Sequence, residues 1–374
     1  MKFNINSKEF DKVLSKVALA IPARTVLPVL YNVLIDIKDN VLSITASDNE
    51  NTIKAVFPVN SESDMSLLLP GKLLTELVRN LPDSALTFEK VDDSLLKITS
   101  ENGEYDLNYL PASEYPQVPE FSDFADADKI TLSPANLKRI IHLTTFAASK
   151  DPVKLSLTGV LFDMTTEGTN FVATDGHKLV QLFSPVLVPE KSGDMIIPEK
   201  TLNLLAKIMD LGDVEIFHIG KDKVLFRMEN IQLISRLIKQ NYPDYRNVIP
   251  AENNNIATLS KDNLLSTVKR VSVVSSQSMV DQVKFVFTRD NLEITVQDIS
   301  SGSKATENMM IDYVGQDLTI GFKSSHLIDI LSHMEGDKIT VHMDTPTRAV
   351  LIKPVELKEG ETLLMLSMPI RLNY

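Results

Sequence analysis

The sequence predicts an α+β fold made of three tandem copies of one unit, each with two helices and several strands. Three sets of similar segments recur along the chain in the same order, and the first set places Phe10, Leu137 and Leu264 at equal intervals. Self-similarity at a fixed period is the signature of a repeated structural unit. One coincidence could arise by chance, but three sets in a single register indicate a true repeat.

Each copy opens with a short β-like run that leads into a helix. The runs are MKFNI, KITL and IATL, and the helical segments are NSKEFDKVLSKV from Asn6, SPANLKRIIHLT from Ser133 and SKDNLLSTVKRV from Ser260. A Ser or Asn at the start of each segment can accept hydrogen bonds from the free N–H groups of a first helical turn. The apolar residues that follow have helical spacing, so we expect an amphipathic helix after the first strand.

A second helical segment lies further along each copy. The three are LLPGKLLTELVRNLPD, IIPEKTLNLLAKIMDLGD and IGFKSSHLIDILSHMEGD. Between the two helices, alternating runs that end at Asp48, Asp175 and Asp298 predict strands joined by turns. The proline-containing segments EYPQVP, NYPDYRNVIP and SMPIRL close the copies.

Polar stretches separate the copies and predict the domain boundaries. The acidic stretch at 122–128 and the Asn-rich stretch at 251–255 have the composition of linkers. We therefore expect domains at 1–125, 126–251 and 252–374.

The composition excludes several classes of protein. The chain has 374 residues, no cysteine and a net charge of −12. Disulfides, thiolate catalysis and cysteine-ligated zinc are therefore excluded. The N-terminal segment is polar from its start, and no apolar run approaches the roughly 20 residues of a membrane span. We expect a soluble cytoplasmic protein that does not associate with membranes.

Positive charge is concentrated on the predicted helices of this acidic chain. Thirteen Lys and Arg against six acidic residues give these segments a net charge of +7, so the rest of the chain carries −19. Surface lysines that serve solubility would account for part of this. The alternative is a shared helical surface that meets the phosphates of a polyanion, without reading its sequence. The segments counted are Ser7–Ala18, Gly71–Leu81, Pro134–Ala147, Pro198–Met209, Ser260–Val273 and Lys323–Met334.

The stretch VATDGHKLVQLF contains the only arrangement of residues in the sequence that resembles a catalytic pair. Asp175 and His177 flank Gly176, and they could be a catalytic pair, ligands or partner contacts, or parts of a tight turn. Asp-Gly is a turn signal, and Asp48 and Asp298 end the equivalent runs of the other copies without a following Gly-His. The repeat therefore favours a turn. The chain has no HExxH, GxSxG or GxGxxG motif, so we expect neither an enzyme nor a cofactor.

Four motifs in order along the whole chain are similar to those of one bacterial family. TVLPVL begins at Thr25, TDGHKL at Thr174, YPDYRNVIP at Tyr242 and MPIRL at Met368. Together with the threefold repeat, they resemble the sliding clamp, the β subunit of DNA polymerase III. The resemblance implies clamp domains that close as a head-to-tail dimeric ring, with helices inside and sheets outside. Such a ring encircles double-stranded DNA and tethers the replicative polymerase, with no catalysis. The alternative is a non-catalytic scaffold that uses the same repeats without encircling DNA.

The resemblance also implies a peptide-binding pocket between the second and third domains. It would take short linear motifs of the DNA polymerase III α subunit, the clamp loader, other polymerases and repair proteins. The matching positions are Lys154, Leu157, Thr174, Gly176, His177, Lys178, Leu179, Pro243, Val248, His326, Met368, Pro369, Ile370, Arg371 and Leu372.

Some pocket positions depart from the family pattern. Lys154 and Lys178 stand where the family usually has Arg, and Lys lacks the planar fork of Arg. Other departures are Lys323, His326, Pro346 and Arg348 at lining positions, the extension Asn373–Tyr374, and Leu155 and Ser156 where the family often has aromatic residues.

Two further groups of residues follow from the resemblance. The expected DNA contacts are Arg24, Lys72, Lys138, Arg139 and Lys200. In the expected dimer interface, an edge strand with Tyr105 and Leu107 meets a helix with Val273 and Val274 of the other protomer.

Overall fold

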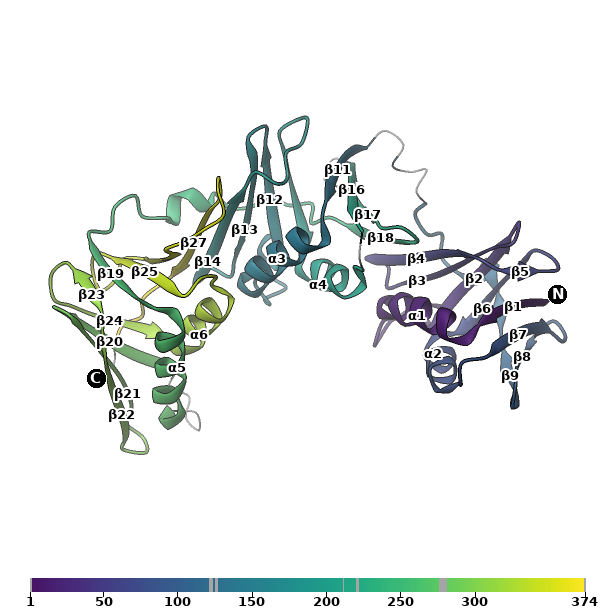
Figure 1. Cartoon of the computed structure of the whole chain (residues 1–374), viewed down its shortest axis with the longest axis horizontal. Coiled ribbons are helices and arrows are strands. Elements are labelled where there is room, and N and C mark those ends of the chain that lie inside the picture. The colour runs from purple at the N-terminus through teal and green to yellow at the C-terminus, as the bar shows by residue number, and fades with distance from the viewer. Residues whose placement is uncertain are drawn as a thin grey trace. The chain divides into compact units, whose positions relative to one another are not determined.

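A computed structural model of the chain describes residues 2–120, 124, 127–210, 212–219, 222–275 and 281–372 (Figure 1). These residues form two compact units. One consists of Met1–Pro134 with Thr201–Leu237, and the other of Ala135–Lys200 with Ile238–Tyr374. The middle copy of the repeat is therefore divided between the units. In the part of the chain that the structure describes, no helix is long and apolar enough to cross a membrane.

The first copy contains two α-helices and ten strands among its described residues. The helices are α1 (Ser7–Val17) and α2 (Gly71–Asn80). The strands are β1 (Lys2–Asn6), β2 (Asn32–Lys38), β3 (Val41–Ser47), β4 (Asn51–Pro58), β5 (Asn60–Ser61), β6 (Met65–Pro70), β7 (Ala85–Lys90), β8 (Leu95–Ser100), β9 (Gly103–Asn108) and β10 (Leu110–Pro111).

The second and third copies repeat this order of elements. The second has α3 (Pro134–Thr144), α4 (Glu199–Ile208), β11 (Asp128–Leu132), β12 (Gly159–Thr165), β13 (Gly168–Thr174), β14 (Lys178–Ser184), β15 (Gly193–Pro198), β16 (Val214–Ile219), β17 (Lys223–Arg227) and β18 (Ile231–Arg236). The third has α5 (Lys261–Ser272), α6 (Ser324–His333), β19 (Asn255–Ser260), β20 (Gln282–Thr288), β21 (Asn291–Asp298), β22 (Ser303–Met310), β23 (Asp312–Val314), β24 (Leu318–Lys323), β25 (Lys338–Met343), β26 (Val350–Pro354) and β27 (Thr362–Ser367). Short 3-10 helices are η1 (Ala18–Ala20), η2 (Pro28–Tyr31), η3 (Ala112–Glu114), η5 (Thr145–Ala147), η6 (Leu155–Thr158), η7 (Tyr245–Val248) and η8 (Val273–Ser275).

The six predicted helices are confirmed, with one difference at the end of α3. The prediction extends this helix to Ala147, but its last turn is the 3-10 helix η5. The hydroxyl groups of Thr144 and Thr145 donate to the carbonyl oxygens of Ile140 and Ile141, at 2.7 and 2.8 Å. Such hydroxyls compete with the backbone for the carbonyls of the preceding turn, which weakens the regular helix.

The capping residue and the apolar stripe that the sequence predicts are both present in α1. The Asn6 side chain accepts hydrogen bonds from the N–H groups of Lys8 and Glu9, at 2.8 and 3.1 Å. Phe10 and Leu14 are fully buried. The rings of Phe10 and Phe88 form a T-shaped pair, with 5.4 Å between centroids. The helix therefore forms because it is capped at its start and covers the sheet with one face.

Strand pairing joins the middle copy to both of its neighbours. In the first unit the nine-stranded sheet has the order β10-β6-β2-β3-β4-β18-β17-β16-β11. In the second unit the order is β15-β12-β13-β14-β27-β26-β25-β19-β23. A five-stranded sheet (β5-β1-β7-β8-β9) and a four-stranded sheet (β22-β21-β20-β24) complete the fold. The boundaries between the sheets thus do not coincide with the boundaries between the copies, because each nine-stranded sheet contains strands of two copies.

The two pairings between copies have the same register, and we call them the first and second junctions. At the first junction, β4 pairs with β18 so that Asn51 faces Ser235. At the second junction, β14 pairs with β27 so that Lys178 faces Ser367. Lys178 follows Asn51 by one full period of the repeat, the same interval that separates Phe10 from Leu137. The repeated sequence therefore forms two equivalent antiparallel junctions.

An ion-pair network ties α3 to the third copy within the second unit. The guanidinium of Arg139 donates to both carboxylate oxygens of Glu335, at 2.6 and 2.7 Å, and of Glu361, at 2.9 and 2.7 Å. The side chains of Arg139 and Glu361 are 14% and 2% exposed. Bidentate ion pairs between a guanidinium and a carboxylate are strong and directional. Arg139, which the resemblance implies as a DNA contact, instead has its donors occupied by two carboxylates at a largely buried position.

We predict that Arg139→Met destabilises the second unit by about 3 kcal/mol, because it leaves Glu361 as an unpaired buried charge. Urea unfolding followed by circular dichroism would measure the change in the free energy of unfolding. The neighbouring exposed residue supplies the control, since Lys138→Met should change this free energy by less than about 0.5 kcal/mol. Equal stability of the two variants would contradict the structural role of Arg139.

Candidate functional site

The Asp-Gly-His sequence forms a turn that is capped by a carboxylate. One oxygen of Asp175 accepts hydrogen bonds from the N–H groups of His177 and Lys178, at 2.8 and 2.9 Å. Gly176 has a φ of 94°, which lies in the region that favours glycine. The hydroxyl of Thr174 donates to the Lys178 carbonyl at 2.7 Å and closes the turn from the other side. Asp175 therefore has the role of a turn residue, as the sequence predicts.

The other two copies contain the same carboxylate-capped turn. Asp48 accepts from the N–H groups of Glu50 and Asn51, at 3.0 and 2.7 Å. Asp298 accepts from the N–H and the hydroxyl of Ser300, at 2.9 and 2.6 Å. These hydrogen bonds, the Ser300 hydroxyl first, lower the pKa of Asp298 to about 2. The three repeat-equivalent aspartates thus share one structural role.

The turn at the second junction is held against the end of β27. The N–H of Met368 donates to the His177 carbonyl at 2.8 Å, and the N–H of Ile370 donates to the Gly321 carbonyl at 2.9 Å. The carbonyl of Ile370 and the side chain of Leu372 lie so close to Gly321 that a Cβ there would be 2.7 to 2.8 Å from them. The segment from Met368 to Leu372 is therefore fixed along β24 beside the turn.

The predicted pocket residues divide into buried and exposed groups at this junction. Leu179 is 2% exposed and belongs to a core cluster with Tyr245 and Leu366. Val248 and Met368 are large apolar side chains that are 52% and 36% exposed. The remaining positions, apart from Lys178, are half-buried or exposed: Lys154, Leu157, Thr174, Gly176, His177, Pro243, His326, Pro369, Ile370, Arg371 and Leu372. Leu179 is thus a core residue, while Val248 and Met368 present apolar surface.

Lys178 is buried and paired, unlike the other polar residues at this junction. It is 8% exposed, and its ammonium lies 2.7 Å from the carboxylate of Asp329 on α6 and 3.6 Å from that of Asp175. The ammonium also lies 6.0 Å from the centre of the Phe146 ring. The Lys178 side chain therefore connects the turn to α6. Lys154 is exposed, and its ammonium donates to the Asp175 carbonyl at 3.4 Å.

Two histidines lie beside each other at the edge of the turn. The rings of His177 and His326 have centroids 6.0 Å apart. Burial lowers the pKa of His326, the Asp175 carboxylate opposes this shift in part, and the ammonium of Lys178 adds to it. His326 is therefore held in its neutral form at neutral pH, when it can donate one hydrogen bond and accept one.

Two of the other residues that depart from the family pattern lie in local polar contacts. Arg348 pairs with Asp344 at 2.8 Å, and Lys323 lies 3.8 Å from Asp281. Pro346 is exposed, and the exposed Leu155 and half-buried Ser156 form the start of η6. Asn373 and Tyr374 lie outside the described residues.

Four of the expected DNA-contacting residues have exposed side chains. Arg24 lies after η1, Lys72 is in the first turn of α2, Lys138 is on α3 and Lys200 is at the start of α4. Of the thirteen cations counted on the predicted helices, only Lys323 falls outside the observed helices, one residue before α6. The positive charge of the helices is thus retained in the structure.

The residues expected in a dimer interface differ in exposure. Leu107 on β9 is 7% exposed and belongs to the core of the first copy. Tyr105 on the same strand is half-buried. Val273 in η8 is 67% exposed, whereas Val274 is half-buried. Leu107 therefore contributes to the stability of a single chain, and Val273 is the apolar side chain that reaches solvent.

The sequence reasoning missed two tyrosines that lie behind the turns. Tyr242 lies close to the backbone of Thr174, and burial raises its pKa. Tyr115 is placed in the same way near Ser47, and burial raises its pKa to about 12. The two tyrosines are one repeat period apart, in the segments EYPQVP and NYPDYRNVIP. The repeat spacing was the signal that could have found them.

Comparisons with known proteins agree with this architecture. Three family models match consecutive parts of the chain: the N-terminal domain of the DNA polymerase III beta subunit at residues 1–119, the central domain at 131–244 and the C-terminal domain at 246–371. The beta sliding clamp of Staphylococcus aureus is 30% identical over 383 residues, which cover 99% of each chain. That of Bacillus subtilis is 29% identical over 99% of this chain and 100% of its own length.

Solved structures of clamps have the same fold. The Bacillus subtilis DNA polymerase sliding clamp matches with a TM-score of 0.92 and 28% identity, over 100% of this chain and 99% of its own. A Bartonella birtlesii sliding clamp, which was solved bound to griselimycin, matches with a TM-score of 0.91 and 28% identity over 100% of both chains. The chain therefore belongs to the family of bacterial DNA polymerase III β subunits, the non-catalytic sliding clamps, and has the function of a DNA sliding clamp.

Proposed function

We propose that two copies of this chain close head to tail into a ring that encircles duplex DNA and tethers the replicative polymerase to it. The domains of this ring would span 1–125, 126–251 and 252–374. Because a replication clamp works on chromosomal DNA, we infer a cytoplasmic location. A tethered polymerase would gain effective concentration at the primer end instead of new contacts to DNA.

The observation that carries the ring is a pair of matching strand edges. Within a chain, the strands β4 and β14 pair with β18 and β27 of the following copy. The strand β22 of the third copy is equivalent to β4 and β14, and β9 of the first copy is equivalent to β18 and β27. Both β9 and β22 lie at the ends of their sheets in the described part of the chain. Since an open edge is a template for another strand, β22 of one protomer would pair with β9 of the other.

Apolar surface beside β22 supports the same interface. Val273 in η8 is 67% exposed, and Met310 at the end of β22 is 88% exposed. η8 contacts β22 within the third copy. Pairing of β22 with β9 would bring this apolar surface against the partner, in addition to the backbone hydrogen bonds.

The exposed cations on the helices would contact the DNA. Arg24, Lys72, Lys138 and Lys200 can approach phosphates, and such contacts carry no sequence information. A clamp that must slide needs this weak, sequence-independent attraction. Duplex DNA is therefore the proposed partner of the helical surface.

The second junction is the proposed site for short linear motifs. The exposed side chains of Val248 and Met368 offer apolar contacts, while the polar turn at His177 offers hydrogen bonds beside them. A linear motif with apolar anchor residues suits such a surface. We infer that the DNA polymerase III α subunit and the clamp loader bind here, and that other polymerases and repair proteins compete for the same surface.

We predict that Val273→Asp converts the dimer into monomers, because it places a charge in an apolar interface. Sedimentation velocity at micromolar concentration would report the mass. Val41→Asp, at a position that is 41% exposed on β3, is the control and should remain dimeric. Leu107 is unsuitable for this test, since its burial means that a substitution would also unfold the first copy. A dimeric Val273→Asp variant would show that the interface lies elsewhere.

The protein should stay on closed circular DNA after it has been loaded by a clamp loader that accepts it, and should leave once the circle is cut. Gel filtration of the DNA before and after linearisation measures this retention. The reason is topological, because a ring that slides cannot leave a closed circle. Equal retention on both forms would instead indicate direct electrostatic binding, and retention on neither form would favour a scaffold that does not encircle DNA.

We predict that Val248→Asp weakens binding of the polymerase α subunit roughly tenfold or more, which is the loss typical of an apolar anchor position at an interface. Surface plasmon resonance with the immobilised clamp would measure the dissociation constant. Val355→Asp is the matched control, because Val355 is 50% exposed in the same unit but lies after β26, outside the proposed surface. Equal losses in both variants would argue against a binding site at the second junction.

A further inference from the structure

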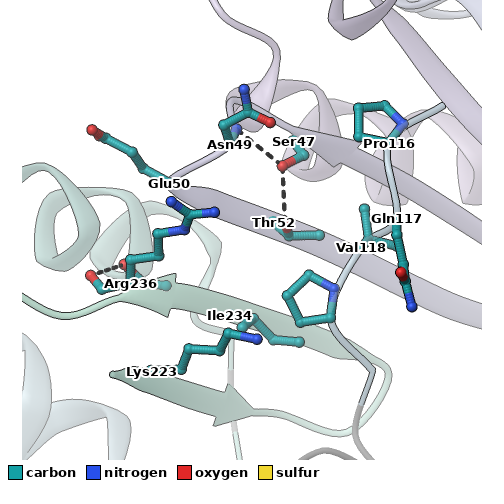
Figure 2. A pocket seen from close by; sticks show the side chains of 12 residues that line it. Ser47, Asn49, Glu50, Thr52, Pro116, Gln117, Val118, Lys223, Ile234 and Arg236 are labelled. Carbon is teal, nitrogen blue, oxygen red and sulfur yellow. Dashed lines mark hydrogen bonds between the residues drawn. The ribbon is translucent and has the colours of Figure 1, made fainter. Parts of the chain in front are cut away.

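The first junction contains a pocket of about 320 Å³, which Figure 2 shows from close by. The turn from β3 to β4 forms one wall and the segment 116–119 another. Strands β17 and β18 form the floor with Lys223, Ile234 and Arg236. A pocket of this size suits a ligand of a few side chains.

This pocket is built from the repeat equivalents of residues at the second junction. The N–H of Arg236 donates to the Glu50 carbonyl at 3.0 Å, and the N–H of Met368 donates to the His177 carbonyl at 2.8 Å. Glu50 precedes His177 by one repeat period. Arg236 and Met368 therefore occupy the same place, one residue after Ser235 and Ser367, the last residues that pair across the two junctions.

The same backbone positions carry different chemistry at the two junctions. Met368 is an apolar side chain that reaches solvent, whereas Arg236 is an exposed cation. Leu179 is replaced at the first junction by Thr52, whose hydroxyl bonds to that of Ser47 at 2.9 Å. Apolar surface remains on one side only, in the segment 116–119, and the neighbouring Ile234 is 4% exposed. The first junction is thus a polar and cationic counterpart of the second.

Two cations face each other across neighbouring strands in this pocket. Lys223 on β17 lies directly opposite Arg236 on β18 in the antiparallel register. Among the residues that the structure describes, neither makes an ion pair with its side chain. The carboxylate of Glu50 also lines the pocket, but it points away from the other side chains in Figure 2. Like charges directly opposite each other in a sheet are destabilising, so a bound anion would remove an unfavourable interaction.

We propose that the pocket at the first junction binds an extended peptide segment of a partner protein that carries an acidic side chain next to an aliphatic one. The carboxylate would lie between Lys223 and Arg236, and the aliphatic side chain would pack on the prolines and Val118 of segment 116–119. This inference rests on the proposed function, because it treats the first junction as the repeat counterpart of a peptide-binding junction. It adds a second site of different specificity, so that one protomer would hold an acidic and an apolar motif at once.

The absence of tryptophan from the sequence allows a direct test. Gln117→Trp places a single fluorophore in the wall of this pocket, and Val248→Trp places one at the second junction. The probes are the capped tripeptide acetyl-Leu-Glu-Leu-amide, its neutral counterpart acetyl-Leu-Gln-Leu-amide, and sodium acetate. Emission of the full-length protein is titrated with each probe at millimolar concentrations.

We expect the Glu peptide to change the emission of Gln117→Trp with saturation, and the Gln peptide and acetate to bind at least about tenfold more weakly. Adding Arg236→Gln should weaken the Glu peptide roughly tenfold, the size expected for one charge-assisted hydrogen bond at an exposed site. Arg236→Lys should retain most of the binding, which separates a lost charge from a misfolded pocket. Lys38→Gln, at an exposed cation of the same unit outside the pocket, should leave the affinity unchanged.

Three outcomes would overturn the proposal: no response of Gln117→Trp to the Glu peptide, equal affinity for acetate, or equal affinity of the Arg236→Gln variant. A response confined to Val248→Trp would place acidic peptides at the second junction instead. Retention on circular DNA is measured with the same protein preparations. A protein that is retained but ignores the peptide would refute the second site alone, and loss of retention would refute the ring.

Discussion

Backbone pairing between copies of the repeat is the interaction on which the rest of the structure depends. A strand edge presents unpaired N–H and C=O groups, and a folded chain must satisfy or protect them. At the first junction β4 meets β18, and at the second junction β14 meets β27 in the same register. The nine-stranded sheets follow from this pairing, as does the division of the middle copy between two compact units. In the proposed ring, two of the open sheet edges, β9 and β22, would pair by the same rule.

One backbone arrangement supports different side-chain chemistry at its two occurrences. The position of Asn51 holds a side chain that accepts a hydrogen bond from Thr201 at 2.7 Å. At the equivalent position, Lys178 carries a buried charge that pairs with Asp329 at 2.7 Å. The capped turns at Asp48 and Asp175 keep the backbone the same, so the two junctions differ only in the side chains that they present. Repetition thus gives the chain two junctions with one backbone geometry and different side chains.

Charge on a helix is not a sufficient indicator of a polyanion surface in this fold. Lys138 and Arg139 are neighbours on α3, and both count toward the positive charge of the helices. Successive residues of a helix project about 100° apart, so Lys138 reaches solvent while Arg139 turns toward the third copy and binds two glutamates. The pattern of charge located the cations on helices, but it could not assign each cation to one face.

The sequence by itself determined the repeat, the six helices, the capped turns and the family. Each of these depends on short-range features: apolar spacing, a capping Asn or Ser, or an Asp before a tight turn. Only the tertiary structure decided which strands pair across the copies, because partners such as Asn51 and Ser235 are far apart in sequence and the alternating pattern of a strand does not name its neighbour. It also decided that Leu107 and Leu179 are core residues, that Arg139 and Lys178 are paired, and that two cations meet at the first junction. These facts arise from contacts between distant segments, where burial and the partner's charge, not the residue type, set the role of a side chain.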